Sequence, residues 1–354
     1  MPNSHFPTPA LRLDGRHPAD IAQAVTVLQQ GGIGGIPTET VYGLAADAFQ
    51  PRAVARVFEA KQRPAFDPLI VHLPEPAWLD RVAREVSPLA RQLANRFWPG
   101  PLTLVLPRQR TVPDLVTSGL DSVAVRIPAH SLARELIARV GSPIAAPSAN
   151  LFGRISPTTA QHVLDQLADR IDFVLDGGPC AVGVESTVVQ VAPEGLRLLR
   201  PGGTTVEEIT AEFPAVAWLD TVSNPGHNLP QVAPGMLTQH YAPRTPLELV
   251  DPAELAGWVQ DWSKSHPLAQ LGLLRWRESP PSRNEPDPLE NNTLLYTEWL
   301  TTDSDWKTAA ARLFACLRRL DESQSELIVA ERVPEIGLGR AINDRLRRAA
   351  ARDQ

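Results

Sequence analysis

Residues 37–73 read PTETVYGLAADAFQPRAVARVFEAKQRPAFDPLIVHL, and the rest of the chain can be interpreted outward from this stretch. A short apolar run, Ile33–Ile36, precedes it and ends at proline and two threonines, which predicts a buried strand opening into hydroxyl groups. Pro51 predicts the start of a helix, because proline is favoured at the first helical position. Leu69–Leu73 then predicts a second buried strand that contains one polar residue, His72. This succession would place polar side chains on rigid elements.

Two cations, Lys61 and Arg63, stand where the predicted helix ends. Pro64 disfavours a helical conformation for Arg63, so both cations would be held in a stiffened turn. They could bind phosphate, but cations at a helix C-terminus also interact favourably with the helix dipole, and taken alone this is the better explanation. Taken alone, His72 is likewise better explained as a hydrogen-bonded core histidine, and Thr40 as an ordinary strand-end residue.

Residues 142–159 form a second informative stretch, SPIAAPSANLFGRISPTT. Its apolar start predicts a short strand, and the small residues that follow include Ser148, Asn150 and Ser156. Small side chains let a ligand approach the backbone, and hydroxyl and amide donors suit phosphate oxygens. In isolation, a turn rich in serine, asparagine and glycine remains the better explanation of this loop.

Together, the two stretches resemble the YrdC-like family of L-threonylcarbamoyladenylate synthases, whose longer members have two domains. The resemblance rests on Lys61-x-Arg63 paired with Ser148-x-Asn150 and on the segments PTETVYGL and PLIVHL. Further motifs that resemble this family are SVAVRIP at 122–128, VESTV at 184–188, LLRPG at 198–202, PGM at 234–236, HYAP at 240–243 and GLGRAINDR at 337–345. The resemblance therefore covers nearly the whole chain.

Length and composition are compatible with a two-domain enzyme. The chain has 354 residues, of which 43% are hydrophobic and 21% charged, as in globular proteins with sizeable cores. The formal net charge of −6 argues against general nucleic-acid binding. Cys180 and Cys316 are the only cysteines, which excludes a disulfide framework and fits a reducing compartment. We find no signal peptide and no apolar run of 18 residues, so we expect a cytoplasmic protein without a membrane span.

Several catalytic classes lack their motifs. The sequence contains no GxxxxGK[ST], HExxH, CxxC or GxSxG pattern, so neither a P-loop of the usual type nor a metalloprotease or hydrolase is predicted. Nor does Gly337-x-Gly339 have the third glycine of a dinucleotide-binding fingerprint.

The pattern of elements predicts an α/β fold with a mixed sheet, because strands and helices alternate but hairpins intrude. Helices are expected at 18–30, 51–63, 87–98, 132–140, 158–168, 252–262, 303–320 and 340–350. Strands are expected at 33–36, 69–73, 102–106, 123–127, 143–146, 173–175, 186–191, 196–199, 247–250, 271–274, 293–296 and 327–330. The resemblance implies a YrdC-like twisted mixed sheet with helices and an open cavity, plus a smaller Rossmann-like α/β C-terminal domain.

Domain boundaries follow from the distribution of prolines. Residues 213–246 hold six prolines and little periodicity, and 34 residues are too many for an idle loop. We therefore expect a catalytic domain at 1–212, a proline-rich linker over the active site at 213–246 and a small domain at 247–354.

The resemblance also implies three sets of site residues. Those with catalytic roles would be Lys61, Arg63, Ser148 and Asn150. Those that bind ATP would be Arg63, Asp67, Ser122, Ser148, Ser156, Arg200 and Tyr241. Those that bind threonine would be Thr40, His72, Arg126, Ala146 and Ser186. Arg126 suits a carboxylate because its planar guanidinium matches two oxygens, although a structural salt bridge is an open alternative. Tyr241 would close over the pocket or, alternatively, simply pack within the linker.

The activity implied is ATP-dependent synthesis of L-threonylcarbamoyladenylate from L-threonine, bicarbonate and ATP, with release of pyrophosphate, for threonylcarbamoyladenosine modification of tRNA. ATP is thus a substrate, a magnesium ion is expected with its phosphates, and no protein metal ligand is predicted. The expected partners are downstream tRNA threonylcarbamoyl-transfer proteins, while tRNA itself would not be bound tightly. Two alternatives stay open: an RNA-binding module of the same fold, and carbamoyl transfer to another acceptor.

Overall fold

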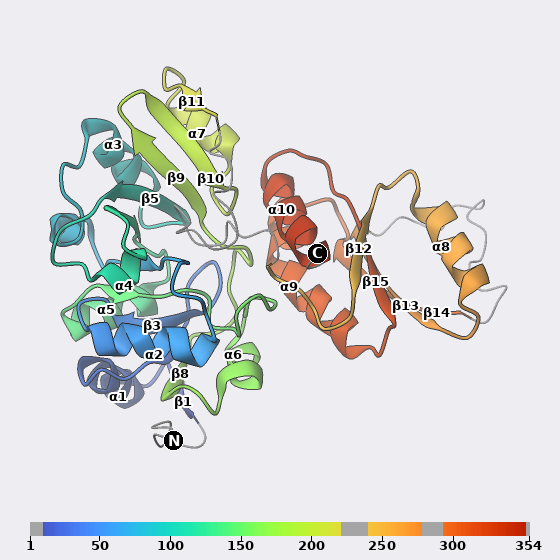
Figure 1. The fold of residues 1–354 in the computed structure, drawn as a ribbon, viewed down its shortest axis with the longest axis horizontal. Helices are drawn as coiled ribbons and strands as arrows, with labels where there is room; N and C mark the ends of the chain where they lie inside the picture. The colour runs from blue at the N-terminus through green and yellow to red at the C-terminus, as the bar shows by residue number, and fades with distance from the viewer. Residues whose placement is uncertain (1–9, 221–239, 278–292, 352–354) are drawn as a thin grey trace. The chain divides into compact units, whose positions relative to one another are not determined.

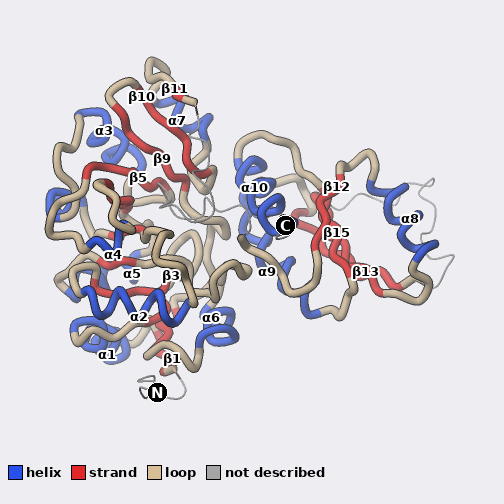
Figure 2. The backbone as a smooth tube through the Cα atoms, viewed as in Figure 1, coloured by secondary structure: helices blue, strands red, loops and turns tan. Residues whose placement is uncertain are grey.

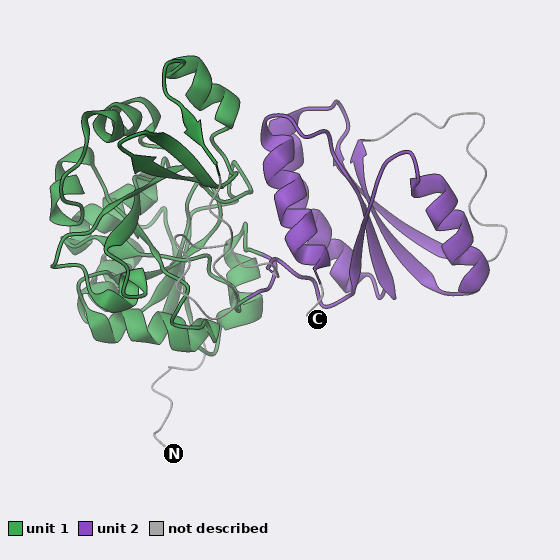
Figure 3. Ribbon diagram, turned by 45° about the horizontal axis from the view of Figure 1, so that its top comes forward, with its two compact units in different colours: residues 1–152, 156–237 green, residues 153–155, 238–354 purple. Residues whose placement is uncertain are grey.

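The computed structural model describes residues 10–220, 240–277 and 293–351, and it separates into two compact units (Figure 3). Unit 1 comprises residues 1–152 and 156–237, and unit 2 comprises residues 153–155 and 238–354. The PGM motif and three of the linker prolines lie outside the described residues, as does the stretch at 278–292. Among the described residues, no helix is long and apolar enough to cross a membrane.

Unit 1 is built on an eleven-stranded mixed sheet with the order β1-β8-β2-β3-β7-β4-β6-β5-β9-β10-β11 (Figure 1). The strands are β1 Leu11–Asp14, β2 Gly34–Ile36, β3 Gly43–Asp47, β4 Ile70–His72, β5 Leu102–Pro107, β6 Ser122–Arg126, β7 Ile144–Ala145, β8 Phe173–Asp176, β9 Thr187–Ala192, β10 Gly195–Arg200 and β11 Trp218–Leu219. Parallel pairs such as β4–β6 stand beside antiparallel pairs such as β9–β10, so the predicted mixed sheet is confirmed.

Most helices of unit 1 begin at a proline or directly after a capping side chain. They are α1 Pro18–Gln29, α2 Pro51–Lys61, the 3-10 helix η1 Pro76–Arg81, α3 Pro88–Phe97, α4 Asp114–Thr117, α5 Ser131–Val140, α6 Ala160–Leu167 and α7 Val206–Glu212. Ser87 caps α3, since its side chain accepts a hydrogen bond from the Ala90 amide. At its other end, α2 stops at Gln62, whose φ of 54° turns the chain toward Arg63.

Different helices cover the two faces of this sheet, because side chains alternate between faces along each strand. One core cluster joins the sheet to α2, α3, α4 and α6, through side chains such as Val57, Leu93, Val116 and Val163. A second cluster on the opposite face joins α1 and α5 to the neighbouring strands β1, β8, β2, β3 and β7, through side chains such as Leu28, Leu136, Ala45 and Phe173.

The face that carries α1 and α5 changes character beyond β7. There the strands β4, β6, β5, β9 and β10 bear a small apolar cluster, to which no helical residue among those described belongs. Its members are Ile70, Val105, Ala124, Val188 and Leu199. His72 and Arg126 share this face, since each lies two residues from a member of the cluster. Polar side chains therefore line the part of the sheet where a helical layer is absent from the described structure.

Unit 2 is a smaller sandwich around a four-stranded parallel sheet with the order β12-β15-β13-β14. Its elements are β12 Leu247–Val250, α8 Leu255–Ser265, β13 Gln270–Arg277, β14 Leu294–Thr301, α9 Trp306–Glu322, β15 Leu327–Glu331 and α10 Leu338–Ala350. Figure 2 shows α8 on one side of the sheet and α9 and α10 on the other, so the predicted small α/β domain with helices on both faces is confirmed.

The structure differs from the sequence prediction at three strands. β1 and β3 were not predicted, and β11 lies inside the segment 213–246 that we expected to be linker. Trp218 pairs with Leu196 of β10, so the sheet of unit 1 extends past residue 212. A two-residue strand such as β11 is too short for a periodicity to show in the sequence.

Candidate functional site

His72 and Arg126 are neighbours because β4 and β6 pair in parallel, with these two residues in register. Arg126 donates its Nε hydrogen to His72 Nε2 over 2.9 Å, and His72 Nδ1 lies 3.1 Å from the Ile70 carbonyl oxygen. These contacts fix a neutral imidazole with its proton on Nδ1. Burial and the neighbouring Arg126 charge lower the pKa of His72 well below its ordinary value.

The loop that follows β2 supplies the other partners of Arg126. Its Nη2 donates to Thr38 Oγ1 at 3.2 Å and to Thr40 Oγ1 at 3.0 Å, and its Nη1 lies 3.1 Å from Glu39 Oε1. All these side chains are buried, and the ion pair with Glu39 compensates the guanidinium charge. Three of the residues predicted to hold threonine, namely Thr40, His72 and Arg126, thus form one hydrogen-bonded cluster.

Ser186 belongs to an adjoining cluster at the start of β9. Its hydroxyl lies 2.7 Å from Thr103 Oγ1 and accepts from Arg200 Nη2 at 3.3 Å. Arg200 also donates to the Ser186 carbonyl oxygen, from Nη2 at 2.9 Å and from Nε at 3.2 Å. Arg200 is 4% exposed, so these bonds hold a buried guanidinium in a fixed position.

The two motifs that we paired from the sequence meet in space. Lys61 Nζ donates to the carbonyl oxygens of Ser148 at 2.6 Å and Asn150 at 2.5 Å. The Ser148 loop is held from its other side by Gly43, which bridges to Ser148, and by the Ala149 amide, which donates to Tyr42 O. Burial and the charge of Arg63 lower the pKa of Lys61 well below its ordinary value.

Arg63 is held by the turn that follows α2. Its Nε and Nη2 donate to the carbonyl oxygens of Asp67 and Pro68 at 3.0 and 2.8 Å, and Nη2 lies 2.9 Å from Asp67 Oδ2. This last contact is an ion pair by distance, yet neither Asp67 carboxylate oxygen has a hydrogen bond of good geometry within the described residues. Burial raises the pKa of Asp67, while the charges of Arg63, Lys61 and Arg200 act against the rise.

Ser156, Ser122 and Ala146 complete the part of the predicted set that lies in unit 1. Ser156 is fully buried and donates to Glu185 Oε1 at 2.6 Å. Ser122 begins β6, on the strand face that carries Arg126, and the Ala146 amide donates to Ile70 O beside His72.

Tyr241, predicted at the ATP, lies in unit 2 and is 1% exposed. Its ring packs 5.6 Å from that of Phe314, and the guanidinium of Arg345 lies 5.3 Å from its centroid. The next residue, Ala242, donates from its amide to Gly153 O. Gly153 belongs to residues 153–155, which follow the Ser148–Asn150 loop in the sequence but are part of unit 2. Its role at ATP remains a prediction.

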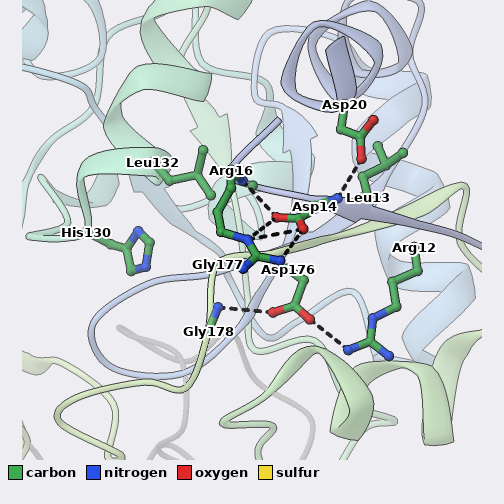
Figure 4. A pocket seen from close by; sticks show the side chains of 11 residues that line it. Arg12, Leu13, Asp14, Arg16, Asp20, His130, Leu132, Asp176, Gly177 and Gly178 are labelled. Carbon is green, nitrogen blue, oxygen red and sulfur yellow. Dashed lines mark hydrogen bonds and ion pairs between the residues drawn. The ribbon is translucent and has the colours of Figure 1, made fainter. Parts of the chain in front are cut away.

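A separate cavity of about 640 Å³ opens at the carboxyl ends of β1 and β8 (Figure 4). Its lining contains none of the predicted site residues. Arg16 binds Asp14 through three side-chain hydrogen bonds, and Arg12 binds Asp176 at 2.8 Å. Both arginines of this lining are therefore already paired with carboxylates of the protein itself.

Sequence reasoning missed Glu39, Thr103 and Glu185, which all bond directly to predicted site residues. Glu39 and Glu185 stand inside the motifs PTETVYGL and VESTV. Carboxylates flanked by residues that read as buried require partners, and this requirement was the available signal.

Known proteins resemble this chain along most of its length. A family model described as "Telomere recombination" (Sua5, YciO and YrdC) matches residues 26–202, and one described as "Threonylcarbamoyl-AMP synthase, C-terminal domain" matches residues 204–351. The chain is 39% identical to a threonylcarbamoyl-AMP synthase of Bacillus subtilis, over 93% of this chain and 92% of that protein. It is 38% identical to one of Pyrococcus abyssi, over 92% and 93% respectively. The crystal structure of P. abyssi Sua5 complexed with L-threonine superposes with a TM-score of 0.85 at 36% identity, covering 97% of this chain and 98% of that one.

Proposed function

This chain belongs to the threonylcarbamoyl-AMP synthase family, and we propose that it makes L-threonylcarbamoyladenylate from L-threonine, bicarbonate and ATP, releasing pyrophosphate. The observation that carries this proposal is the meeting of Lys61 with the Ser148–Asn150 loop, beside buried arginines. It is supported by the P. abyssi structure, whose protein is complexed with L-threonine and matches nearly the whole chain.

The chemistry requires positioning more than a protein nucleophile. The threonine amine and bicarbonate give a carbamate and water, and a carbamate oxygen then attacks the α-phosphorus of ATP while pyrophosphate leaves. Negative charge builds on the phosphate oxygens, so fixed cations and donors stabilise the transition state. In this proposal Lys61, Arg63 and Arg200 supply that charge. A bound triphosphate would itself favour the protonated form of Lys61, because a nearby anion raises the pKa of an amine.

The threonine end would be read by the other cluster. Arg126 would bind the carboxylate, and the hydroxyls of Thr40 and Ser186 would pair with the side-chain hydroxyl. A site built to pair a hydroxyl rejects an analogue that lacks it, because its own polar groups are then left unpaired. The proposal therefore includes a strong preference for threonine over valine, with serine between them.

Magnesium would enter with the phosphates of ATP. Within the described residues no group of three or more histidine, cysteine, aspartate or glutamate side chains could hold a metal ion. Mg²⁺ carried by a nucleotide keeps several waters and takes one or two protein carboxylates. Asp67 is the candidate among the chain's own residues, since it is buried beside Arg63 and its carboxylate oxygens accept no hydrogen bond from the residues that the structure describes. The ion would neutralise phosphate charge as pyrophosphate departs.

The product, a mixed anhydride, is prone to hydrolysis, so a further protein must consume it promptly. We propose that this is a tRNA threonylcarbamoyl-transfer protein and that tRNA is not held tightly here, in keeping with the net charge of −6. The RNA-binding alternative gains no support from that charge. The other alternative is carbamoyl transfer to a different acceptor. That reaction would not require threonine, whereas the proposed synthesis does.

One assay tests the function. Full-length protein is incubated with ATP, Mg²⁺, labelled bicarbonate and threonine, valine or serine, and both pyrophosphate and labelled adenylate are measured. We expect both products with threonine, less with serine and least with valine. Equal pyrophosphate release without any amino acid would contradict the proposal, and salt-dependent RNA binding without ATP turnover would favour the RNA-binding alternative.

A further inference from the structure

Glu39 is a buried carboxylate, and the described residues bond to one of its two oxygens. Its side chain is 8% exposed, and Oε1 lies 3.1 Å from Arg126 Nη1. Oε2 has no hydrogen-bond partner among the residues that the structure describes. Leaving a buried polar atom unpaired is destabilising, and more so when the group is charged, so this oxygen requires an explanation.

Apart from Arg126, the described titratable groups on which the charge of Glu39 acts are neutral, so they do not balance that charge. Its charge acts on Cys180 and His130, and both are held neutral. Burial raises the pKa of the Cys180 thiol to about 12, and burial lowers the pKa of His130. Arg126 is thus the cation to which the described structure pairs Glu39.

Arg126 also has one donor that the described residues leave unused. A guanidinium has five N–H donors. One reaches His72, two reach Thr38 and Thr40, and one reaches Glu39. Within the described residues, one N–H of Nη1 therefore remains, and it is on the nitrogen that faces Glu39.

We propose that the Glu39–Arg126 pair recognises the amino-acid end of threonine as a zwitterion, with Oε2 of Glu39 accepting the ammonium group and the remaining Nη1 hydrogen of Arg126 binding the carboxylate. An acceptor and a donor left over on two bonded side chains match a cation and an anion that are two bonds apart in the ligand. The inference rests on the proposed function, and it assigns Glu39 a direct substrate contact that neither the motifs nor the comparisons give it.

The test compares two ligands that differ only at the position in question. L-Threonine carries the ammonium, whereas (2S,3R)-2,3-dihydroxybutanoate carries a hydroxyl there and keeps the carboxylate and the side chain. Binding of each to full-length protein is measured by calorimetry. Hydrogen bonds to charged groups contribute about 1.5–3 kcal/mol, which corresponds to roughly tenfold or more in affinity. We expect the wild type to prefer threonine by at least that factor.

Glu39→Gln keeps the size of the side chain and removes its charge. We expect it to lose most of the preference for threonine, while its affinity for dihydroxybutanoate changes little. The matched control is Glu135→Gln on α5, an exposed glutamate paired with Arg139, which should leave both affinities unchanged. If Glu39→Gln fails to fold, Glu39→Asp keeps the charge near Arg126 but withdraws it by one methylene, and it should weaken threonine binding selectively.

Two outcomes would overturn the inference, and they are distinguishable. Equal weakening of both ligands by Glu39→Gln would mean that Glu39 acts only by holding Arg126, and the proposed synthesis would still stand. Failure of the wild type to bind threonine, together with no threonine-dependent pyrophosphate release, would overturn both the inference and the proposed function.

Discussion

At the scale of single residues, the buried cations of unit 1 are all paired with groups of the protein itself. Lys61 is held by two carbonyl oxygens, Arg63 by Asp67 and Arg126 by Glu39. Removing a charge from water costs several kcal/mol, so pairs of this kind are weak evidence for stability. Their effect is to fix cations in position before charge develops on a substrate, which is the condition for electrostatic stabilisation of a transition state.

Lys61→Met tests this idea. Methionine keeps much of the buried volume but supplies no charge, so we expect pyrophosphate release to fall by roughly a hundredfold or more, as when one preorganised donor is lost. Turnover is measured at saturating threonine with ATP varied. Lys264→Met, at an exposed lysine of α8, is the control and should keep full activity. Wild-type turnover by a folded Lys61→Met protein would remove Lys61 from the catalytic set.

His72 gives a prediction for the dependence of stability on pH. Because its pKa is lowered in the folded state, the unfolded chain binds a proton near pH 6.5 that the folded chain does not. The free energy of unfolding should therefore fall as the pH decreases below about 6.5, by up to about 1.4 kcal/mol per pH unit from this residue. In His72→Gln, whose amide can still accept from Arg126, that contribution should vanish.

The measurement is urea unfolding of wild type and His72→Gln at pH 7.5, 6.5 and 5.5. The pKa of His130 is also lowered, but that residue is present in both proteins and its contribution cancels in the difference. Parallel pH profiles would show that His72 titrates alike in the folded and unfolded chains.

At the scale of elements, the sequence predicts those strands and helices whose signals are local. Pro51 and Pro88 begin helices, and the apolar run through His72 forms β4. β3 was missed because GLAAD contains no β-branched or aromatic residue, although all five of its residues are buried. It forms a strand because it pairs with β2 and β7. This pairing cannot be derived from residues 43–47 alone.

The same division applies to the site. The resemblance named candidate side chains on several short motifs, and their roles stay predictions. The structure brings Lys61 into contact with the Ser148–Asn150 loop and joins Arg126 to His72 and Thr40. The partners that make burial possible, Glu39 for Arg126 and Thr103 for Ser186, depend on strand register and on a loop that follows another strand. Register is set by pairing across the sheet, so these bonds could not be derived from spacing along the chain.

Gly202 tests how tightly two elements must meet at the site. A Cβ on Gly202 would lie 2.3 Å from Glu185 O and 2.4 Å from Thr187 N, both backbone atoms that cannot move aside. We expect Gly202→Ala to displace the segment that carries Ser186 and Arg200 and so to lower the unfolding midpoint. Threonine-dependent turnover should fall by about tenfold or more, since small misplacements are costly in catalysis. Unfolding midpoints and pyrophosphate release are measured together.

The matched control for this variant is Gly257→Ala in α8. A Cβ there would meet nothing within 4 Å, and alanine is favoured over glycine in a helix by roughly 0.5–1 kcal/mol. We therefore expect unchanged activity and slightly higher stability. A Gly202→Ala protein as active as this control would mean that the turn after β10 can shift without affecting the site.

At the scale of the whole molecule, unit 2 includes a piece of the loop that follows Asn150. Arg318 of α9 donates to the Ile155 carbonyl oxygen at 2.7 Å, Arg154 donates to Pro243 O at 3.4 Å, and the Ala242 amide donates to Gly153 O. Residues 153–155 are continuous in the chain with Asn150 and Ser156, which we place at ATP. We infer that unit 2 restrains residues 153–155, which lie in the sequence between two proposed substrate-binding residues.

Truncation separates a restraining role from that of a tethered spacer. A chain ending at Asp220 retains all eleven strands of unit 1, so we expect it to fold, but residues 153–155 lose the three hydrogen bonds that unit 2 supplies. Synthesis of the adenylate should then fall by roughly ten- to a hundredfold, the scale of a loosened binding loop. In the full chain, Arg318→Met removes one of these bonds and should reproduce part of the loss, whereas Arg277→Met, at an exposed arginine of β13, should not. Since both variants keep unit 2 attached, a tether would leave them equally active. If the truncated chain makes the adenylate at the full-length rate, residues 153–155 hold their position without help, and the restraint inferred here does not act.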